Sequence, residues 1–535
     1  MLYFVPAWHQ PDSWSENEQY WYVRREHTEF DDTVKQVQLF HRNGNYPYRI
    51  ILLSFAPNFR HFLHRQGVYH AAYWSCFDAM LEITRTKAAF FSYKDMKWPE
   101  DCEFLYTNFA MVVERKGERF ARIDFGEDGN LIQVDTYKDG RILRRNIYDD
   151  RGFVTGSILY RDGQPVSQDY MNGKGSWKLR VFFDDGHVEV NPKLPNYRLA
   201  EGGREEYRPY KALRYDSLGD MVAEVFEAYV GFIEKDEAAI YCLAADGFYA
   251  PVEQKALKGQ RIILSFFENR CGDLKEEHMR ALIKDASYLI ADSSDNLKLL
   301  KRSIKSRYAR FKEITPYDTR TDSGISQQLR VQKILVPIDG VSDEEYGKLL
   351  GEIAPYLAGN PNAVVHLFSR RADYWLKRDW MAKTRDILGR LGYDTRWAAD
   401  EDNQQNVAEV NPDGEEVRRR FFVEQCIDEM SVNRCLREQR IMVDIRKQAE
   451  LYLQITALSV GIPQIVRART NYVVDGMNGA VIKDVKEVRP YLVKYLDELK
   501  EWNRAKVHSY EISQMYSTKV LLDMWEEVIG SIERD

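Results

Sequence analysis

The chain has 535 residues, which at about 150 residues per domain predicts three or four domains. Hydrophobic residues make up 44% of the chain, enough to form large cores, so the composition excludes global disorder. Lysine and arginine number 76 against 83 acidic residues. The resulting net charge of −7 argues against a dedicated nucleic-acid-binding protein, which would carry a clear basic excess.

Cysteine usage and the start of the chain predict a cytoplasmic protein. The six cysteines form no Cys-x-x-Cys pair and no Cys/His group with zinc spacing, so we expect buried or partly buried free thiols. The first eight residues, MLYFVPAW, lack a basic segment and form too short an apolar run for a signal peptide. Since no stretch of 18 apolar residues occurs, any membrane contact would be peripheral, at the inner face of the cell membrane.

The first hundred residues alternate short apolar runs with helical patterns. Leu2–Val5 and Arg49–Leu53 are predicted to be buried strands. Thr28 is a candidate cap for a helix between them, in which apolar residues from Phe30 to Phe40 recur at helical spacing. Such alternation indicates a parallel sheet covered on both faces.

From about Phe104 to Val190 the pattern becomes that of an antiparallel sheet. Short apolar–polar runs alternate with turn signals spaced 10 to 13 residues apart. The runs include Ala121–Phe125, Leu131–Asp135, Ser157–Tyr160 and Trp177–Phe183, and the turn signals are Asp128-Gly129, Asp139-Gly140, Asp150-Arg151-Gly152, Asp162-Gly163, Asn172-Gly173 and Asp185-Gly186. Because Asp-Gly and Asn-Gly supply the positive φ angles of tight hairpins, we predict a meander of six or seven strands.

The alternating α/β pattern resumes around Asp216, so the meander is predicted to be an insertion. The candidate strands that would continue the first sheet are Ala238–Leu243, Arg261–Phe266 and Ser287–Ala291. After a polar linker, Thr315–Arg330, a second α/β unit is predicted from Lys333–Pro337, Ala363–Phe368, Arg419–Val423 and Arg440–Ile445. An amphipathic helix is expected over about Ser509–Ile529.

Common catalytic motifs are absent. No G-x-G-x-x-G, G-x-x-x-x-G-K-[ST], H-E-x-x-H or G-x-S-x-G occurs, which leaves a dinucleotide fingerprint, a P-loop, a zincin site and an α/β-hydrolase elbow without support. The run Asp400-Glu401-Asp402 matches a metal-binding D-x-D, although its polar surroundings favour a solvated loop over a cation site. We expect neither a metal nor a cofactor.

The histidines give weak signals. His61 and His64 could share one helix face, as could Arg60 and Arg65, and a surface or core-edge role is favoured for them. Trp8 and His9 follow the first strand, where open α/β sheets bind ligands. For Trp8, packing is favoured over stacking on a ligand, and both interpretations stay open.

Lys298 to Lys312 contains seven basic residues and no acid, with an apolar stripe from Leu297 to Phe311 at helical spacing. This pattern is typical of a basic amphipathic helix. One interpretation is a helix that packs on the sheet and keeps a solvated basic face. The other is contact with an anionic surface, a lipid or an acidic partner, through Lys301, Arg302 and Lys305.

The C-terminal unit carries the most specific motif. A helix ending in TALSVG precedes Pro463 and a strand at Gln464–Val466, and Tyr472–Val481 then holds two glycine turns. Helix ends and such turns present backbone N–H groups to phosphate or sugar. These residues resemble the sugar-nucleotide domain of retaining GT-B glycosyltransferases, whose motif runs E-x₇-E-A-x-x-x-G-x-P-x-I and then x-V-x-D-G-x-N-G. The matching positions are Ala457, Gly461, Pro463, Ile465, Asp475, Gly476, Asn478 and Gly479.

The two motif glutamates fall at Gln448 and Thr456, so neither position carries a carboxylate. In the family those acids lie beside the donor sugar and its nucleotide. The resemblance therefore implies a degenerate donor site at Gln448, Thr456 and Gly461, with no catalytic residue. Glu450 lies nearby but off register, which leaves an active GT-B enzyme with displaced acids as the alternative.

As a whole, the chain is similar to the first of the Asp-group accessory Sec system proteins of Gram-positive bacteria. The resemblance is carried by Tyr3–Trp8, by Ile314–Arg320 with Ser326–Leu329, and by Arg440–Asp444 with Arg446–Gln448. It implies an α/β fold: a GT-B-like pair of Rossmann-like domains with an inserted antiparallel β-sheet domain. The expected parts are 1–100 with 205–325 (N-terminal Rossmann-like), 101–204 (inserted sheet), 326–505 (C-terminal Rossmann-like) and 506–535 (a C-terminal helix that crosses back).

The same resemblance implies a non-enzymatic transport protein. It would act with the other two Asp-group proteins and the accessory SecA motor, and would deliver a glycosylated serine-rich repeat adhesin to the accessory SecY channel. The meander resembles the extended sheet through which partner glycosyltransferases contact proteins. Trp8, Ser369 and Arg467 are the candidate residues for binding glycan or unfolded cargo in a cleft between the two halves. A peripheral membrane scaffold that uses the basic helix is a third hypothesis.

Overall fold

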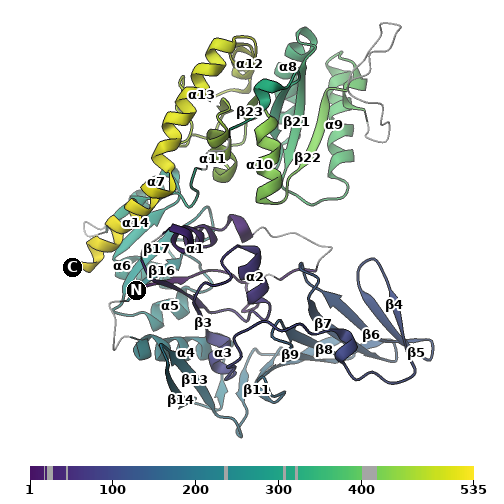
Figure 1. Ribbon diagram of the computed structural model, residues 1–535, viewed down its shortest axis with the longest axis vertical. Coiled ribbons are helices and arrows are strands. Elements are labelled where there is room, and N and C mark those ends of the chain that lie inside the picture. Colours follow the sequence, from purple (N-terminus) through teal and green to yellow (C-terminus); the bar gives the residue numbers. More distant parts are fainter. Residues whose placement is uncertain are drawn as a thin grey trace. The chain divides into compact units, whose positions relative to one another are not determined.

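The computed structural model describes residues 1–16, 18–20, 28–43, 46–233, 239–304, 309–319, 323–399 and 419–534 (Figure 1). The chain folds into two compact units. Unit 1 comprises Met1–Asp292, Asn296–Glu313 and Glu526–Asp535, and unit 2 comprises Ser293–Asp295 and Ile314–Trp525.

Unit 1 is built on a seven-stranded parallel sheet. Every residue of the central strands β1 (Leu2–Val5) and β16 (Ile240–Ala244) is buried, as expected for a sheet covered on both faces. The strand order is β19 (Phe311–Glu313), β18 (Tyr288–Ala291), β17 (Arg261–Phe266), β16, β1, β2 (Tyr48–Leu52) and β3 (Tyr73–Ser75). All five strands predicted for this sheet are confirmed, and the two short edge strands β3 and β19 were missed.

The first of the seven helices described between the strands of unit 1 corrects a predicted cap. Helix α1 (Asp32–Asn43) begins four residues after Thr28, which lies in a short 3₁₀ turn. The Asp31 carboxylate accepts hydrogen bonds from the backbone N–H groups of Thr33 (2.9 Å) and Val34 (3.2 Å), so Asp31 is the cap. The other helices are α2 (Phe59–Arg65), α3 (Cys76–Met80), α4 (Leu218–Ile233), α5 (Ala250–Ala256), α6 (Glu277–Asp285) and α7 (Ser294–Ser303).

The insertion is a ten-stranded antiparallel sheet in which β4 to β12 follow one another as neighbours and β15 (Arg214–Tyr215) closes the far edge. In Figure 1 it extends away from the parallel sheet. The strands are β4 (Cys102–Tyr106), β5 (Met111–Arg115), β6 (Glu118–Phe125), β7 (Leu131–Lys138), β8 (Arg141–Asp149), β9 (Phe153–Arg161), β10 (Gln164–Met171), β11 (Trp177–Phe182) and β12 (Val188–Val190). A separate hairpin pairs β13 (Asn196–Glu201) with β14 (Arg204–Pro209).

The predicted antiparallel meander is confirmed, but the predicted number of strands, six or seven, was too low. Asp139 and Gly140 both have positive φ, as do Asp162 and Gly163, which is the hairpin geometry expected from their sequence. The first hairpins were missed because β5 and β6 are joined at Lys116-Gly117, which adopts the same geometry without an Asp-Gly or Asn-Gly signal.

Unit 2 contains a six-stranded parallel sheet that runs between helices on both sides (Figure 1). Its order is β22 (Phe421–Gln425), β21 (Ala363–Ser369), β20 (Gln332–Pro337), β23 (Ile441–Asp444), β24 (Gln464–Val466) and β25 (Gly479–Val481). All five strands predicted here are confirmed. The helices are α8 (Asp343–Gly359), α9 (Leu376–Arg390), α10 (Glu429–Glu438), α11 (Leu451–Val460), α12 (Val488–Leu496) and α13 (Leu499–Ser513), and α14 (Thr518–Glu533) continues from unit 2 into unit 1.

The predictions of two long helices from the sequence are wrong. The basic helix ends at Ser303, and Lys312 lies in strand β19, where it pairs with Ile290 of β18. The predicted helix over Ser509–Ile529 is divided between α13 and α14. Between them, the Tyr516 carbonyl accepts a hydrogen bond from the Thr319 N–H (2.9 Å) and Ser517 is extended, so tertiary bonding interrupts the amphipathic pattern.

The remaining general predictions concern thiols and membranes. The six cysteines are free, three buried and three partly buried, as expected. Within the described ranges, no helix combines the length and the apolarity needed to cross a bilayer.

Candidate functional site

The sheet of unit 2 has its topological switch point between β20 and β23. From this pair, the chain order runs outward in opposite directions, to β21 and β22 on one side and to β24 and β25 on the other. In open α/β sheets, ligands bind beyond the carboxyl ends of the strands at such a point. The residues that follow these strands are therefore the candidate site. We call the side chains of Asp339, Ser369, Arg370, Asp444, Arg446 and Glu450 the edge cluster.

Ser369, the last residue of β21, lies inside the edge cluster. Its side chain is fully buried, and its hydroxyl donates to the Asp339 carboxylate at 2.6 Å. The same carboxylate accepts a hydrogen bond from the Arg370 N–H at 2.8 Å. Asp339 therefore stabilises the turn after β21, and the Ser369 hydroxyl proton is already used in the hydrogen bond to Asp339.

Glu450 joins two arginines of the edge cluster. One of its oxygens accepts from Arg370 at 2.8 Å and the other from Arg446 at 3.1 Å. Arg446 also makes a bidentate pair with Asp444 at 2.8 and 2.9 Å. Burial alone would lower the pKa of Arg446, but the two carboxylates raise it above its ordinary value, so the guanidinium stays charged.

Arg467 follows β24 and pairs with Glu345 in the first turn of α8. That helix is capped by the Ser342 hydroxyl and carries Asp343, Glu344 and Glu345 in its first turn. A helix N-terminus attracts anions. Here the chain's own acids occupy that position, so the N-terminus of α8 does not attract a further phosphate.

The positions corresponding to the GT-B donor motif have structural partners or face solvent. Gln448 is exposed in the loop before α11. Thr456 is buried in α11, and its hydroxyl donates to the Tyr452 carbonyl at 2.7 Å. Gly461 ends α11 with a left-handed φ of 77°.

The loop between β24 and β25 uses its polar side chains to hold its own shape. The buried Asn478 side chain donates to the Tyr472 carbonyl and accepts from the Val474 N–H, each at 2.8 Å. Asp475 accepts from the Val481 N–H at 2.9 Å. This explains part of the glycosyltransferase-like motif by loop architecture alone.

In unit 1, the corresponding switch point lies between β1 and β16. His9 follows β1 and contacts Asp246, which follows β16, at 3.2 Å. Trp8 is only 6% exposed, packs against Phe59 and Phe62, and donates its indole N–H to Asp31 at 3.0 Å. Its packing accounts for its position, and a role in ligand binding stays a prediction.

Charged groups surround Arg270, which lies near the pair of His9 and Asp246. Its guanidinium contacts Asp31 at 3.1 Å and Asp32 at 2.5 Å. Burial, reinforced by the neighbouring Asp32 carboxylate, raises the pKa of Asp31 to about 6. Burial would also raise the pKa of Asp246, but His9 and nearby backbone N–H groups lower it below its ordinary value.

The remaining sequence candidates lie elsewhere. Lys301 and Arg302 are exposed on α7, whereas Lys305 lies outside the described residues, as does the Asp400-Glu401-Asp402 run. His61, on α2, contacts Asp128 at 3.3 Å at the core edge. One exposed turn brings Asp184, Asp185 and His187 together, and two backbone N–H groups of that turn are bonded to its aspartates at 3.0 and 3.1 Å.

The family model described as the first accessory Sec system protein of the Asp group matches residues 1–531. The chain belongs to this family. An accessory Sec system protein of Streptococcus gordonii is 29% identical over 532 residues, covering 98% of each chain. The resemblance inferred from the sequence is thus confirmed, and the protein has a role in the accessory Sec system.

Solved structures confirm the fold class. The Streptococcus pneumoniae structure described as accessory secretory protein 1, 2 and 3 contains a chain that is 28% identical, with full coverage of both chains and a TM-score of 0.79. The pneumococcal O-GlcNAc transferase GtfA, described as a complex with UDP and GlcNAc, has a TM-score of 0.68 at 11% identity, with 100% and 99% coverage. That likeness shows the GT-B-like fold alone.

For this accessory Sec protein, sequence reasoning missed an exposed aromatic pair beside the edge cluster. Tyr374 and Trp375 precede α9 and are 83% and 51% exposed. Gln425, at the end of β22, donates to the carbonyls of Arg371 and Asp373 and fixes the loop that presents them. The signal was available, because adjacent aromatic residues follow a predicted strand at the same carboxyl edge as Ser369.

Proposed function

We propose that this chain is a non-enzymatic component of the accessory Sec export system. It acts with the other two Asp-group proteins and the accessory SecA motor, and helps deliver a glycosylated serine-rich repeat adhesin to the translocase. The solved S. pneumoniae relative is described as a complex of accessory secretory proteins 1, 2 and 3, and this supports the same assembly for the present chain.

One observation carries the non-enzymatic part of the proposal. Three of the arginines that follow β21, β23 and β24, namely Arg370, Arg446 and Arg467, each pair with a carboxylate of unit 2. A nucleoside diphosphate needs cations that are not already paired with a carboxylate of the chain. Here it would have to displace Glu450 or Glu345 and would meet their repulsion.

The edge also offers a surface for cargo. Tyr374 and Trp375 form an edge-to-face pair with centroids 4.7 Å apart, and Arg378 stacks on Trp375 at 4.1 Å. Exposed aromatic faces bind the apolar faces of sugar rings and the side chains of unfolded polypeptide. Ser369 ends β21, the strand that leads to this pair, whereas Arg467 follows β24, three strands away at the same edge of the sheet. Both stay candidates for cargo binding, as does Trp8 in unit 1.

The enzymatic alternative is an active glycosyltransferase in which Glu450 serves as a displaced acid. Titration calorimetry with UDP-GlcNAc, together with transfer to a serine-rich peptide, separates the two functions. We expect no binding heat at millimolar concentration and no transfer. Transfer by the wild-type chain that disappears in Glu450→Gln would overturn the adaptor function.

Cargo binding is tested with an adhesin fragment, glycosylated and unglycosylated, and the purified full-length chain. Trp375→Ala should weaken binding about tenfold, which corresponds to about 1.4 kcal/mol. Tyr510→Ala, an exposed tyrosine of α13 (60%), is the matched control and should change the affinity less than twofold. Equal effects of the two substitutions would contradict cargo binding at this edge.

Peripheral contact with anionic membrane is the remaining part of the proposal. Co-sedimentation with phosphatidylglycerol vesicles, with and without Lys301→Glu and Arg302→Glu, tests it directly. Binding that is unchanged in the double variant would remove α7 from any membrane role.

A further inference from the structure

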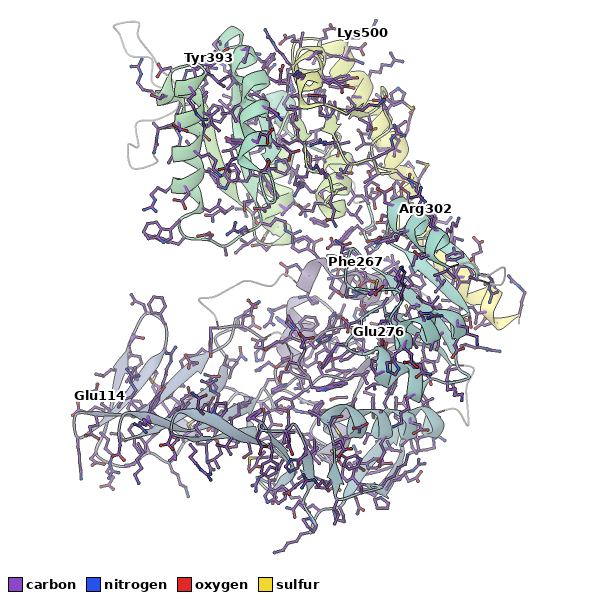
Figure 2. All side chains as sticks on the ribbon, turned by 180° about the vertical axis from the view of Figure 1, so that it is seen from behind. Glu114, Phe267, Glu276, Arg302, Tyr393 and Lys500 are labelled. Atoms are coloured by element: carbon purple, nitrogen blue, oxygen red, sulfur yellow. The ribbon has the colours of Figure 1, made fainter. Side chains whose placement is uncertain are left out.

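A solvent-open pocket of about 910 Å³ lies within unit 1, between helices α6 and α7. Its end wall is the loop after β17, and none of the residues assigned above to cargo binding lines it. Figure 2 labels Arg302 on α7 and two residues of the same unit. Phe267 lies in that loop, and Glu276 lies directly before α6. The pocket is therefore separate from the edge cluster of unit 2.

More of the pocket lining is apolar than polar. Leu299 and Leu300 are neighbours on α7, but Leu300 is 1% exposed and belongs to the core, whereas Leu299 is 52% exposed and faces the pocket. A single exposed leucine needs no explanation. In this case it shares the pocket with other apolar lining residues, which are Phe266, Leu274, Ile283, Ala286, Ile304 and Ala309.

The rim of the pocket is basic. Lys275, Arg280, Lys284 and Arg302 line it, all four are exposed, and none makes an ion pair with another described residue. The acids that line it are Glu268 and Asp273, and the Asp273 carboxylate accepts a hydrogen bond from the Lys275 N–H at 2.9 Å. Four cations against two acids favour an anionic occupant.

The walls have the spacing of helix-packing surfaces. On α6 the lining residues are Arg280, Ile283 and Lys284. On α7 they are Asn296, Leu299, Leu300, Arg302 and Ser303, and all of these except Arg302 lie at positions i, i+3, i+4 and i+7. Ridges of this kind receive a third helix.

We propose that this pocket, which we call the α6–α7 groove, binds an acidic amphipathic helix of a partner protein. Two turns of the helix place apolar side chains on Leu299 and the lining beneath it. Carboxylates on the flanks of the same helix pair with the four rim cations. The choice of partner rests on the proposed function: it is one of the other Asp-group proteins or the accessory SecA motor.

Site-specific cross-linking tests where the partner lies. The full-length chain carries a benzophenone amino acid at position 299, is mixed with each purified partner and is irradiated. We expect a cross-link to one partner, in a peptide with net negative charge and apolar residues at helical spacing. No cross-link, or a cross-link to a basic or non-helical segment, overturns the groove.

Binding affinities test the chemistry of the groove. Leu299→Asp should weaken binding at least tenfold, and Leu213→Asp (50% exposed, in the same unit) less than twofold. The pair Lys284→Glu with Arg302→Glu should weaken binding at least tenfold at low salt and less at high salt. The charge-matched control is Lys255→Glu with Lys258→Glu, on exposed positions in and after α5.

The outcomes distinguish the groove from the proposed function. If the complex assembles with unchanged affinity in both groove variants, the transport function stands and the groove is wrong. If the groove variants retain partner binding but Leu299→Asp loses binding to phosphatidylglycerol vesicles, the occupant is lipid and the proposal is overturned. Weaker vesicle binding in the Arg302→Glu variant alone is the peripheral contact proposed above for α7.

Discussion

Two aspartates at the carboxyl edge of the first sheet have pKa shifts of opposite sign. Asp31 lies next to Asp32 and Arg270, and burial raises its pKa from 3.8 to about 6. Asp246 pairs with His9, and its pKa is lowered from 3.8 although burial opposes this. Since the two side chains belong to the same edge of one sheet, they allow a test with an internal control.

Between about pH 4 and pH 6, the folded chain keeps a proton on Asp31 that the unfolded chain has released. The contribution of Asp31 to the free energy of unfolding therefore falls as the pH rises through this window. We predict that the free energy of unfolding of the wild-type chain, minus that of Asp31→Asn, falls by about 1 to 3 kcal/mol from pH 4 to about pH 7 and stays level above that. Urea unfolding at each pH measures it.

Asp246 should behave in the opposite way. Its contribution is present above pH 3.8 and is lost as the pH falls through its lowered pKa. The difference between the wild-type chain and Asp246→Asn should therefore shrink toward acid pH. If the difference in the free energy of unfolding changes with pH in the same direction for both variants, then either the burial of Asp31 or the pairing of Asp246 with His9 does not act as described.

At the residue scale, sequence reasoning located positions better than partners. The rule that ligands bind beyond strand ends selects Ser369 and Arg467, and the structure places both at the carboxyl edge of one sheet. Their roles stay predictions. The pairing of Arg370 with Glu450 joins residues 80 apart in the chain, and no local pattern reveals such a pair.

Among the elements, the β24–β25 pair shows why the GT-B-like motif persists without its acids. Gly479 pairs with Gln464, and a Cβ atom at Gly479 would lie 2.1 Å from the Gln464 carbonyl oxygen. The obstacle is backbone, which cannot move without breaking the sheet. This part of the motif is therefore required by strand packing, whether or not a donor binds.

Gly479→Ala should accordingly cost about 3 kcal/mol of stability, since the strands must separate to admit the methyl group. Gly476→Ala is the control: its φ of 76° is left-handed, but open space surrounds its Cβ position. We expect that control to cost about 1 kcal/mol. Urea midpoints measure both, and equal losses would contradict the steric explanation.

At the element scale, the buried parallel strands were predictable because continuous apolar runs between turn signals have few other solutions. The long amphipathic helices were not. The apolar stripe after Leu300 serves a short helix and then an edge strand, and the stripe after Ser509 is interrupted where Tyr516 packs on Tyr472. Periodicity does not reveal where tertiary bonding ends a helix.

At the scale of the whole molecule, one helix belongs to both units. Residues of α14 up to Trp525 belong to unit 2, and those from Glu526 onward belong to unit 1. Val528, Ile529 and Ile532 are almost fully buried, and Glu527 pairs with Lys312 of β19. The last turns of the chain are thus part of the core of the N-terminal unit, and we propose that the C-terminal helix crosses back to it.

Val528→Asp tests this shared helix. A carboxylate at a fully buried position should cost unit 1 about 3 kcal/mol, because it must be desolvated or protonated. Amide hydrogen exchange should then become about a hundredfold faster in β1 and β16, and should stay unchanged in β20 and β21 of unit 2. The reverse result is expected for Ile512→Asp, since Ile512 is buried in α13 within unit 2. If either substitution accelerates exchange equally in both sheets, the units do not unfold separately, and the chain acts as one cooperative body.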